Sequence, residues 1–293
     1  MSMPRYDPSG LSKRAEIANQ LVDLFRRFLI DRLNDVTWRE FVIDPMLVVE
    51  KVCAIRQHES LRATLLLHQN SLGHLAVGYV RPACEEYVWL AYLNLVDKDK
   101  VRTLISSLAL EESTRSIAAQ HRHMGVRGMV ALGFPDRFLT ENQARGRIAR
   151  TQLKALGAEL GWPPDRQGRQ RGRPPSSDWI AAQVGQERLY DYLYSASSRM
   201  LHFAVSEITR RGWGTAGDEQ VLRFDDPGYV AYRTDFALSW QVYLLTQTAG
   251  ILADGPIMNK SEGKAMASAV ERFGALGPVP IIRPEEMNLT QQP

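Results

Sequence analysis

The sequence feature that most constrains the fold is a pair of charges inside an apolar run. From Leu72 to Leu95 almost every residue is apolar or small, yet Arg81 and Glu85 lie near the middle. An apolar run of this length predicts a buried helix, and charged side chains are seldom fully buried unless they are paired. Residues four apart share one face of a helix. We therefore expect Arg81 and Glu85 to contact each other, or a shared partner, in an interior cavity.

Pro82 lies within the same run. A proline inside a helix lacks the N–H that would bond to the carbonyl four residues earlier, and its ring clashes with that carbonyl. The residue in question is Gly78, which can absorb the resulting bend. We expect one helix over residues 72–95 with a kink at this point.

Helical signals recur along the rest of the chain, whereas strand signals are scarce. Apolar spacing predicts a helix over residues 11–33, and Asp44-Pro45 is typical of a helix start, here for a helix that runs to about His68. Asp178 is expected to cap a short helix. The remaining expected helices cover residues 98–123, 136–160, 178–185, 187–211, 229–253 and 263–273. The predicted fold is all-α, a multi-helix bundle with an Arg/Pro-rich loop and a short irregular or β segment near 220–224.

A single helical domain over residues 1–293 is the expected organisation, because the late helices are apolar enough to need the early ones as packing partners. Residues 1–10 and about 275–293 are predicted to be flexible tails, and residues 161–177 a mobile basic loop rich in Pro, Gly and Arg. The run over 75–93 would place three charges in a bilayer, so no membrane span is predicted. The first ten residues lack a signal-peptide pattern, and we expect a cytoplasmic protein.

Basic charge is concentrated in one part of the chain. Between Glu141 and Pro175, eight Arg or Lys residues stand against three Asp or Glu, a net of +5 that leaves −2 for the rest. The loop arginines can contact nucleic-acid phosphates; they are Arg166, Arg169, Arg171 and Arg173. They lack interleaved aromatic residues, so a solvated loop is the alternative. One predicted interaction is therefore contact with RNA through this loop. A homodimer is a second, separate possibility.

A second polar stripe follows helical spacing later in the chain. It consists of Tyr190, Tyr194, Ser198 and His202, with Arg199 at its border. If the stripe faces Arg81 and Glu85, the bundle contains an internal polar cluster. Such a cluster either fixes the register of the helices as a satisfied network, or it binds a small ligand through Tyr190, Tyr194 and Ser198.

Two segments carry a resemblance to a known family. LLLHQNSLGHLAVGYVRPACEE contains Arg-Pro-x-x-Glu, and LYDYLYSASSRMLHF places Tyr and Ser before His. Both resemble signatures of the bacterial domain-of-unknown-function family 5677, over about residues 45–205. The resemblance implies an all-helical, uncharacterised protein that is distantly similar to HEPN ribonucleases. The matching residues are Arg81, Glu85, Tyr194, Ser198 and His202.

The chemistry of a HEPN ribonuclease is only weakly indicated by the residues. Its signature is Arg, four to six residues, then His, whereas Arg199 and His202 have two residues between them. Arg62 with His68 and Arg115 with His121 fit the spacing, but about as often as chance predicts. His58, His121 and His123 lack metal-ligand spacing and are interpreted as surface histidines. No metal and no cofactor is predicted.

We expect an interaction or regulatory module whose polar cluster is structural or binds a small ligand. The alternative is a metal-independent, HEPN-like ribonuclease of bacterial defence or a toxin system. Its candidate catalytic residues are Arg81, Glu85, Arg199 and His202, with His202 as acid or base and an arginine to stabilise phosphate charge. Whether the chain is an enzyme stays open.

Overall fold

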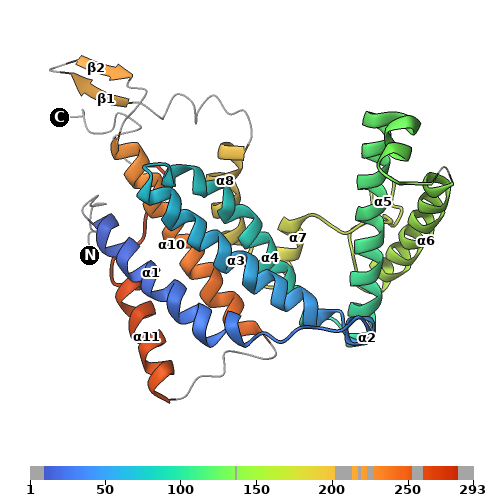
Figure 1. The fold of residues 1–293 in the computed structure, drawn as a ribbon, viewed down its shortest axis with the longest axis horizontal. Coiled ribbons are helices and arrows are strands. Elements are labelled where there is room, and N and C mark those ends of the chain that lie inside the picture. Colours follow the sequence, from blue (N-terminus) through green and yellow to red (C-terminus); the bar gives the residue numbers. More distant parts are fainter. Residues whose placement is uncertain are drawn as a thin grey trace. The chain divides into compact units, whose positions relative to one another are not determined.

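The structure, a computed structural model, describes residues 10–135, 137–201, 213–216, 219–222, 227–252 and 260–282. The chain forms two compact units (Figure 1). Unit 1 comprises Met1–Asp35, Glu50–Ala91 and Val184–Pro293, and unit 2 comprises Val36–Val49 and Tyr92–Gln183. The single domain over residues 1–293 stays a prediction.

The all-α fold predicted from the sequence is confirmed. Unit 1 is built from α1 (Gly10–Phe28), η1 (Ile30–Arg32), α3 (Met46–Gln69), η2 (Gly73–Tyr79), α4 (Val80–Leu93), α8 (Glu187–Leu201), β1 (Trp213–Ala216), β2 (Glu219–Leu222), α10 (Pro227–Ile251) and α11 (Lys260–Gly274), although α3 begins and α4 ends in unit 2. Unit 2 contains α2 (Trp38–Ile43), α5 (Lys98–Ala131), α6 (Phe138–Glu159) and α7 (Ser177–Gln183).

The two strands form an antiparallel hairpin in which Trp213 pairs with Leu222 and Ala216 with Glu219. The sequence predicts a strand near 220–224, and β2 covers the first part of it; residues 223–226 lie outside the described residues. β1 was not predicted. Its Trp-Gly-Thr-Ala sequence has little of the apolar alternation that marks a strand.

The start of α3 agrees with the Asp44-Pro45 signal. The Asp44 carboxylate accepts a hydrogen bond from the Met46 N–H at 3.1 Å. This contact satisfies one of the backbone donors that the first turn of a helix leaves free. The helix then continues to Gln69, one residue beyond the predicted end.

The prediction of a single kinked helix over residues 72–95 is wrong. Gly73–Tyr79 is a 3-10 helix, and the α-helix begins only at Val80. Pro82 therefore lies in the first turn of α4, where a missing N–H removes no intrahelical bond. Gly73 lies so close to α10 that a Cβ there would overlap the side chain of Thr234. The Gln241 amide donates to the carbonyl of Ala76 at 3.2 Å, which also joins this segment to α10.

Three other local predictions need correction. The helix expected over 98–123 extends to Ala131, with a break at Gly125, where φ is +68°. Asp178 lies inside the first turn of α7 and is not its cap. His58 is a core residue, 2% exposed, and not a surface histidine. Its Nε2 lies 3.0 Å from the carbonyl oxygen of Val22 on α1, a contact that spacing along α3 alone does not reveal.

The core of unit 1 brings α1, α3, α10 and α11 together. Its buried apolar side chains include Leu21, Leu61, Leu238, Leu245 and Ala269. A buried ion pair joins Arg14 of α1 to Asp235 of α10. Arg14 Nη2 also donates to the carbonyls of Leu276 and Gly277, each at 3.2 Å. The chain after α11 is thereby attached at Leu276 and Gly277, and the hydroxyls of Tyr192 and Tyr232 donate to the carbonyls of Val279 and Pro280. Residues 283–293 of the predicted tail lie outside the described residues.

Unit 2 is organised around α5 and α6, which pack side by side (Figure 1). Gly146 allows this close approach, because a Cβ there would meet Thr114 Cγ2 at 2.5 Å. The Asn142 amide donates to the carbonyl of Thr114 at 3.3 Å. Near the end of α6, Gly157 lies against the ring of Trp162, a side chain only 3% exposed: a Cβ at Gly157 would come within 2.8 Å of that ring.

Candidate functional site

The charged pair of α4 forms as the sequence predicts. Arg81 Nε lies 2.9 Å from Glu85 Oε1. The hydroxyl of Tyr190, on α8, donates to the same carboxylate oxygen at 3.3 Å. The guanidinium carbon of Arg81 lies 4.5 Å from the ring centroid of Tyr194, a cation–π distance. The two polar stripes therefore meet within unit 1.

The pair is not enclosed by the protein. The prediction that it lies in an interior cavity is therefore wrong. The side chains of Arg81 and Glu85 are 25% and 31% exposed. The buried face of α4 is the apolar one, which contains Ala83, Cys84 and Val88. Burial opposes the charge of Arg81, but the hydrogen bond to Glu85 and the attraction of its carboxylate outweigh burial and raise the pKa of Arg81.

The other residues of the second stripe are only partly placed. Tyr190 is buried, whereas Tyr194 is 41% exposed, and the two rings are tilted by 34° with centroids 5.7 Å apart. Ser198 and Arg199 are half-buried on the last turns of α8. His202 lies outside the described residues. The structure therefore joins Arg81, Glu85, Tyr190 and Tyr194, and the roles predicted for Ser198, Arg199 and His202 stay predictions.

The polar groups of these four residues find most of their interaction partners within the cluster. Glu85 accepts from Arg81 and from Tyr190, and the face of the Arg81 guanidinium is covered by Tyr194. Such a network fixes how α4 and α8 pack. A ligand at this position would compete with contacts that already exist.

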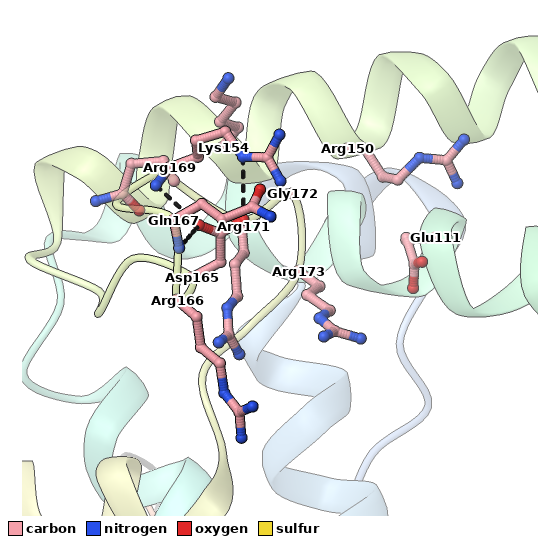
Figure 2. Close-up of a pocket in the computed structure, with 11 residues that line it drawn as sticks. Glu111, Arg150, Lys154, Asp165, Arg166, Gln167, Arg169, Arg171, Gly172 and Arg173 are labelled. Atoms are coloured by element: carbon pink, nitrogen blue, oxygen red, sulfur yellow. Dashed lines mark hydrogen bonds and ion pairs between the residues drawn. The ribbon is translucent and has the colours of Figure 1, made fainter.

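A second candidate site is a basic cleft in unit 2, with a volume of about 750 Å³. We call it the basic cleft; the residues that line it are Glu111, Arg150, Lys154, Asp165, Arg166, Gln167, Arg169, Gln170, Arg171, Gly172 and Arg173. Figure 2 shows Arg150 on α6 and Glu111 on α5. Lys154 also belongs to α6, and the remaining lining residues belong to the loop that follows it. All four arginines predicted from the loop sequence line this cleft.

The cleft also contains residues that the sequence analysis missed. Arg150 and Lys154 are four apart on α6 and share one face of that helix. They belong to the same basic stretch of sequence as the loop, so the i, i+4 spacing was the signal that could have included them. Glu111 comes from α5, 54 residues before Asp165 in the numbering of the chain, and no local pattern points to it.

Most of the positive charge in the cleft is not neutralised by the protein. Arg169 pairs with Asp165 at 3.2 Å, and Glu111 pairs with Arg115 at 3.8 Å. Among the described residues, no carboxylate lies within 4.0 Å of the charged nitrogens of Arg150, Lys154, Arg166, Arg171 or Arg173. Figure 2 shows the side chains of Arg166, Arg171 and Arg173 extending to the same side of the loop. Such an arrangement attracts anions.

The loop is held by a compact turn centred on Asp165. One carboxylate oxygen, Oδ1, accepts from the backbone N–H groups of Gln167 and Arg169, each at 2.9 Å. Oδ2 accepts from Arg169 Nε at 3.2 Å. The Arg169 backbone N–H, then that of Gln167 and the Arg169 guanidinium, outweigh partial burial and lower the pKa of Asp165. The carboxylate is therefore ionised at neutral pH.

Two further contacts attach the loop to the helices of unit 2. The Gln170 amide donates to the carbonyl of Trp162 at 3.1 Å, and Trp162 Nε1 donates to the Tyr92 hydroxyl at 2.9 Å. Gly172 lies against α6, where a Cβ would come within 2.7 Å of the Arg150 carbonyl oxygen. These contacts bring the arginines of the loop next to Arg150 and Lys154. The mobility expected for residues 161–177 stays a prediction.

In the part of the chain that the structure describes, no three His, Cys, Asp or Glu side chains gather in a way that could hold a metal ion. Within the same residues, no helix combines the length and apolar character that crossing a membrane requires.

Fold and site together define an all-helical protein with a basic cleft between two packed helices and the loop that follows them. Residues 49–220, more than half of the chain, match the family of unknown function DUF5677, and the chain belongs to this family. The match includes Arg81 and Glu85 as well as the whole basic cleft. No curated protein and no solved structure gives a significant match.

Proposed function

We propose that the chain is an interaction module that binds the phosphate backbone of a nucleic acid in the basic cleft of unit 2. The observation that carries the proposal is the convergence of six Arg and Lys side chains on one cleft that contains two carboxylates. Phosphate contacts by Arg and Lys release counterions, and this supplies most of the affinity of sequence-independent binding.

The composition of the cleft favours backbone contact over base recognition. Its lining contains no aromatic residue on which a base could stack. Guanidinium groups match the geometry of phosphate oxygens and can donate two parallel hydrogen bonds. Such contacts position a nucleic acid without reading its sequence. We therefore expect similar affinities for RNA and DNA of the same length and charge.

The test compares two pairs of substitutions on one helix. Arg150→Gln with Lys154→Gln removes two charges from the cleft, and Arg145→Gln with Arg147→Gln removes two from α6 outside it. Binding of fluorescent RNA and DNA to the full chain is measured by anisotropy over a range of salt concentrations. The cleft variant is expected to bind about 10-fold or more weakly, with a salt slope reduced by about 1 to 2.

The matched control decides whether position matters. The Arg145 and Arg147 variant is expected to keep most of the affinity, because its charges lie outside the cleft. Equal losses in both variants would indicate a response to net charge alone and would overturn the cleft as the binding site. No binding by the unsubstituted chain at low salt would overturn the proposal itself.

The other functions predicted from the sequence stay predictions. A ribonuclease would need His202, which lies outside the described residues, and a small-ligand role would need to displace the contacts of Arg81 and Glu85. The RNA used in the binding experiment also tests for cleavage. If the unsubstituted chain cleaves this RNA without metal and a folded His202→Ala variant leaves it intact, the ribonuclease is favoured.

A further inference from the structure

Asp165 is an acidic residue in a cleft whose proposed ligand is an anion. Its charge opposes phosphate binding, and a carboxylate at this position requires an explanation. The contacts supply one: Asp165 receives two backbone N–H groups and one guanidinium from residues two and four positions later. A backbone bond from the Asp165 N–H to the Arg169 carbonyl, at 2.8 Å, closes the same turn.

The turn has a direct effect on the arginines. Residues 166–173 carry four guanidinium groups within eight positions, and like charges so close together repel one another. An aspartate side chain that bonds to the backbone two residues on is a recognised way to hold such a turn. Arg166 is one of the residues of this turn. Arg171 and Arg173 come directly after it in the sequence, on either side of Gly172, which lies against α6.

We infer that Asp165 is a positioning residue for the basic cleft: its carboxylate closes the turn that holds the loop arginines in the arrangement that binds phosphate. This inference rests on the function proposed above. Asp165 acts through Arg166, Arg171 and Arg173 and does not itself contact the ligand. Its geometry, more than its charge, is what the site requires.

Charge and geometry make opposite predictions for substitutions at this position. If Asp165 were only a negative charge near the ligand, every neutral replacement would strengthen nucleic-acid binding. If it positions the loop, a replacement that cannot accept the two backbone N–H groups weakens binding although it makes the cleft more positive. Three replacements separate the two effects.

Asp165→Ala removes both the charge and the hydrogen-bond acceptor, and we expect it to bind nucleic acid about 5- to 10-fold more weakly than the unsubstituted chain. Asp165→Asn keeps an oxygen at the position of Oδ1, and we expect it to restore the affinity. Asp165→Glu keeps the charge on a longer side chain that does not fit the turn, and we expect the weakening seen with Ala. Glu111→Gln removes the other carboxylate of the cleft and is expected to bind slightly more tightly.

Affinity is measured by anisotropy with a 20-nucleotide RNA, together with thermal unfolding of each variant and amide hydrogen exchange of residues 165–173. Unchanged melting temperatures with faster exchange in the Ala and Glu variants support a local role. Tighter binding by the Ala variant, or equal binding by the Ala and Asn variants, would overturn the inference. If the unsubstituted chain binds no nucleic acid, the proposed function fails, and hydrogen exchange alone then tests whether Asp165 holds the loop. Equal protection of the loop in all variants would overturn the positioning role as well.

Discussion

His58 shows how one side chain can link the stability of unit 1 to pH. It is 2% exposed, and its Nε2–H donates to the carbonyl of Val22 on α1 at 3.0 Å. Burial lowers the pKa of the imidazole below its usual value of 6.5, and the nearby guanidinium of Arg62 acts in the same direction, although the bond to Val22 opposes both. The residue is therefore neutral in the folded state near neutral pH.

The consequence is a loss of stability in weak acid. The unfolded chain binds a proton at His58 near pH 6.5, whereas the folded chain does so only at a lower pH. Between these two values the unfolded state holds more protons, and the free energy of unfolding falls by up to about 1.4 kcal/mol per pH unit. Above pH 6.5 this contribution is fully present.

Urea unfolding between pH 5 and 8 tests this expectation. His58→Gln keeps a neutral donor for the Val22 carbonyl, so the variant should lose less stability than the unsubstituted chain as the pH falls. His123→Gln is the control, because His123 is exposed on α5. A His58→Gln variant with the same pH dependence as the unsubstituted chain would show that His58 does not supply the proton linkage.

At the scale of elements, the segment before α4 illustrates what an apolar run can and cannot predict. A run without clear period indicates burial, and Arg81 with Glu85 four residues later indicates a shared helical face; the 2.9 Å pair confirms this. The 3-10 segment before Val80 packs against Thr234 and Gln241, more than 150 residues later in the chain. No local pattern contains that information.

The close approach of this segment to α10 gives the second prediction. Gly73→Ala would place a Cβ against the side chain of Thr234 in a packed interior, and overpacking of this kind costs about 1–3 kcal/mol. Gly263→Ala is the control, since apart from the neighbouring backbone of α11 no atom of the described residues lies within 4 Å of the new Cβ, and the site is inside α11. We expect the control to stabilise the chain by about 0.5–1 kcal/mol. Chemical unfolding measures both, and equal signs for the two variants would contradict the packing argument.

At the scale of the whole molecule, charge was easier to predict than its arrangement. The four loop arginines are close in sequence and were predicted as one patch. Spacing could have grouped Arg150 with Lys154 on one face of α6, but only the structure shows that the loop lies against this face. Helical spacing alone predicted Arg199 and His202 beside Arg81. Arg199 is half-buried on the last turns of α8, His202 lies outside the described residues, and the part of both in the cluster stays a prediction.

Arg14 joins parts of unit 1 that lie far apart in the sequence, and this leads to the last prediction. Its side chain is 4% exposed, and it contacts Asp235 of α10 and the carbonyls of Leu276 and Gly277. Arg14→Leu would leave the Asp235 carboxylate, 1% exposed, without this buried partner, and loss of one partner of a buried pair costs about 3–5 kcal/mol. The same change removes two of the hydrogen bonds to the chain after α11, those to Leu276 and Gly277, and leaves the bonds from Tyr192 and Tyr232 to Val279 and Pro280 in place.

Two measurements together test this role. Urea unfolding should show the loss of stability, and limited proteolysis should cut residues 275–282 faster in the Arg14→Leu variant, because the two carbonyl contacts there are gone. Arg272→Leu is the control: its exposed guanidinium also joins α11 to α1, through Gln20 at 2.8 Å, but it leaves no buried charge behind. We expect that control to change stability by less than about 1 kcal/mol. Similar losses in both variants would mean that the bridge between the helices matters and the buried charge pair does not.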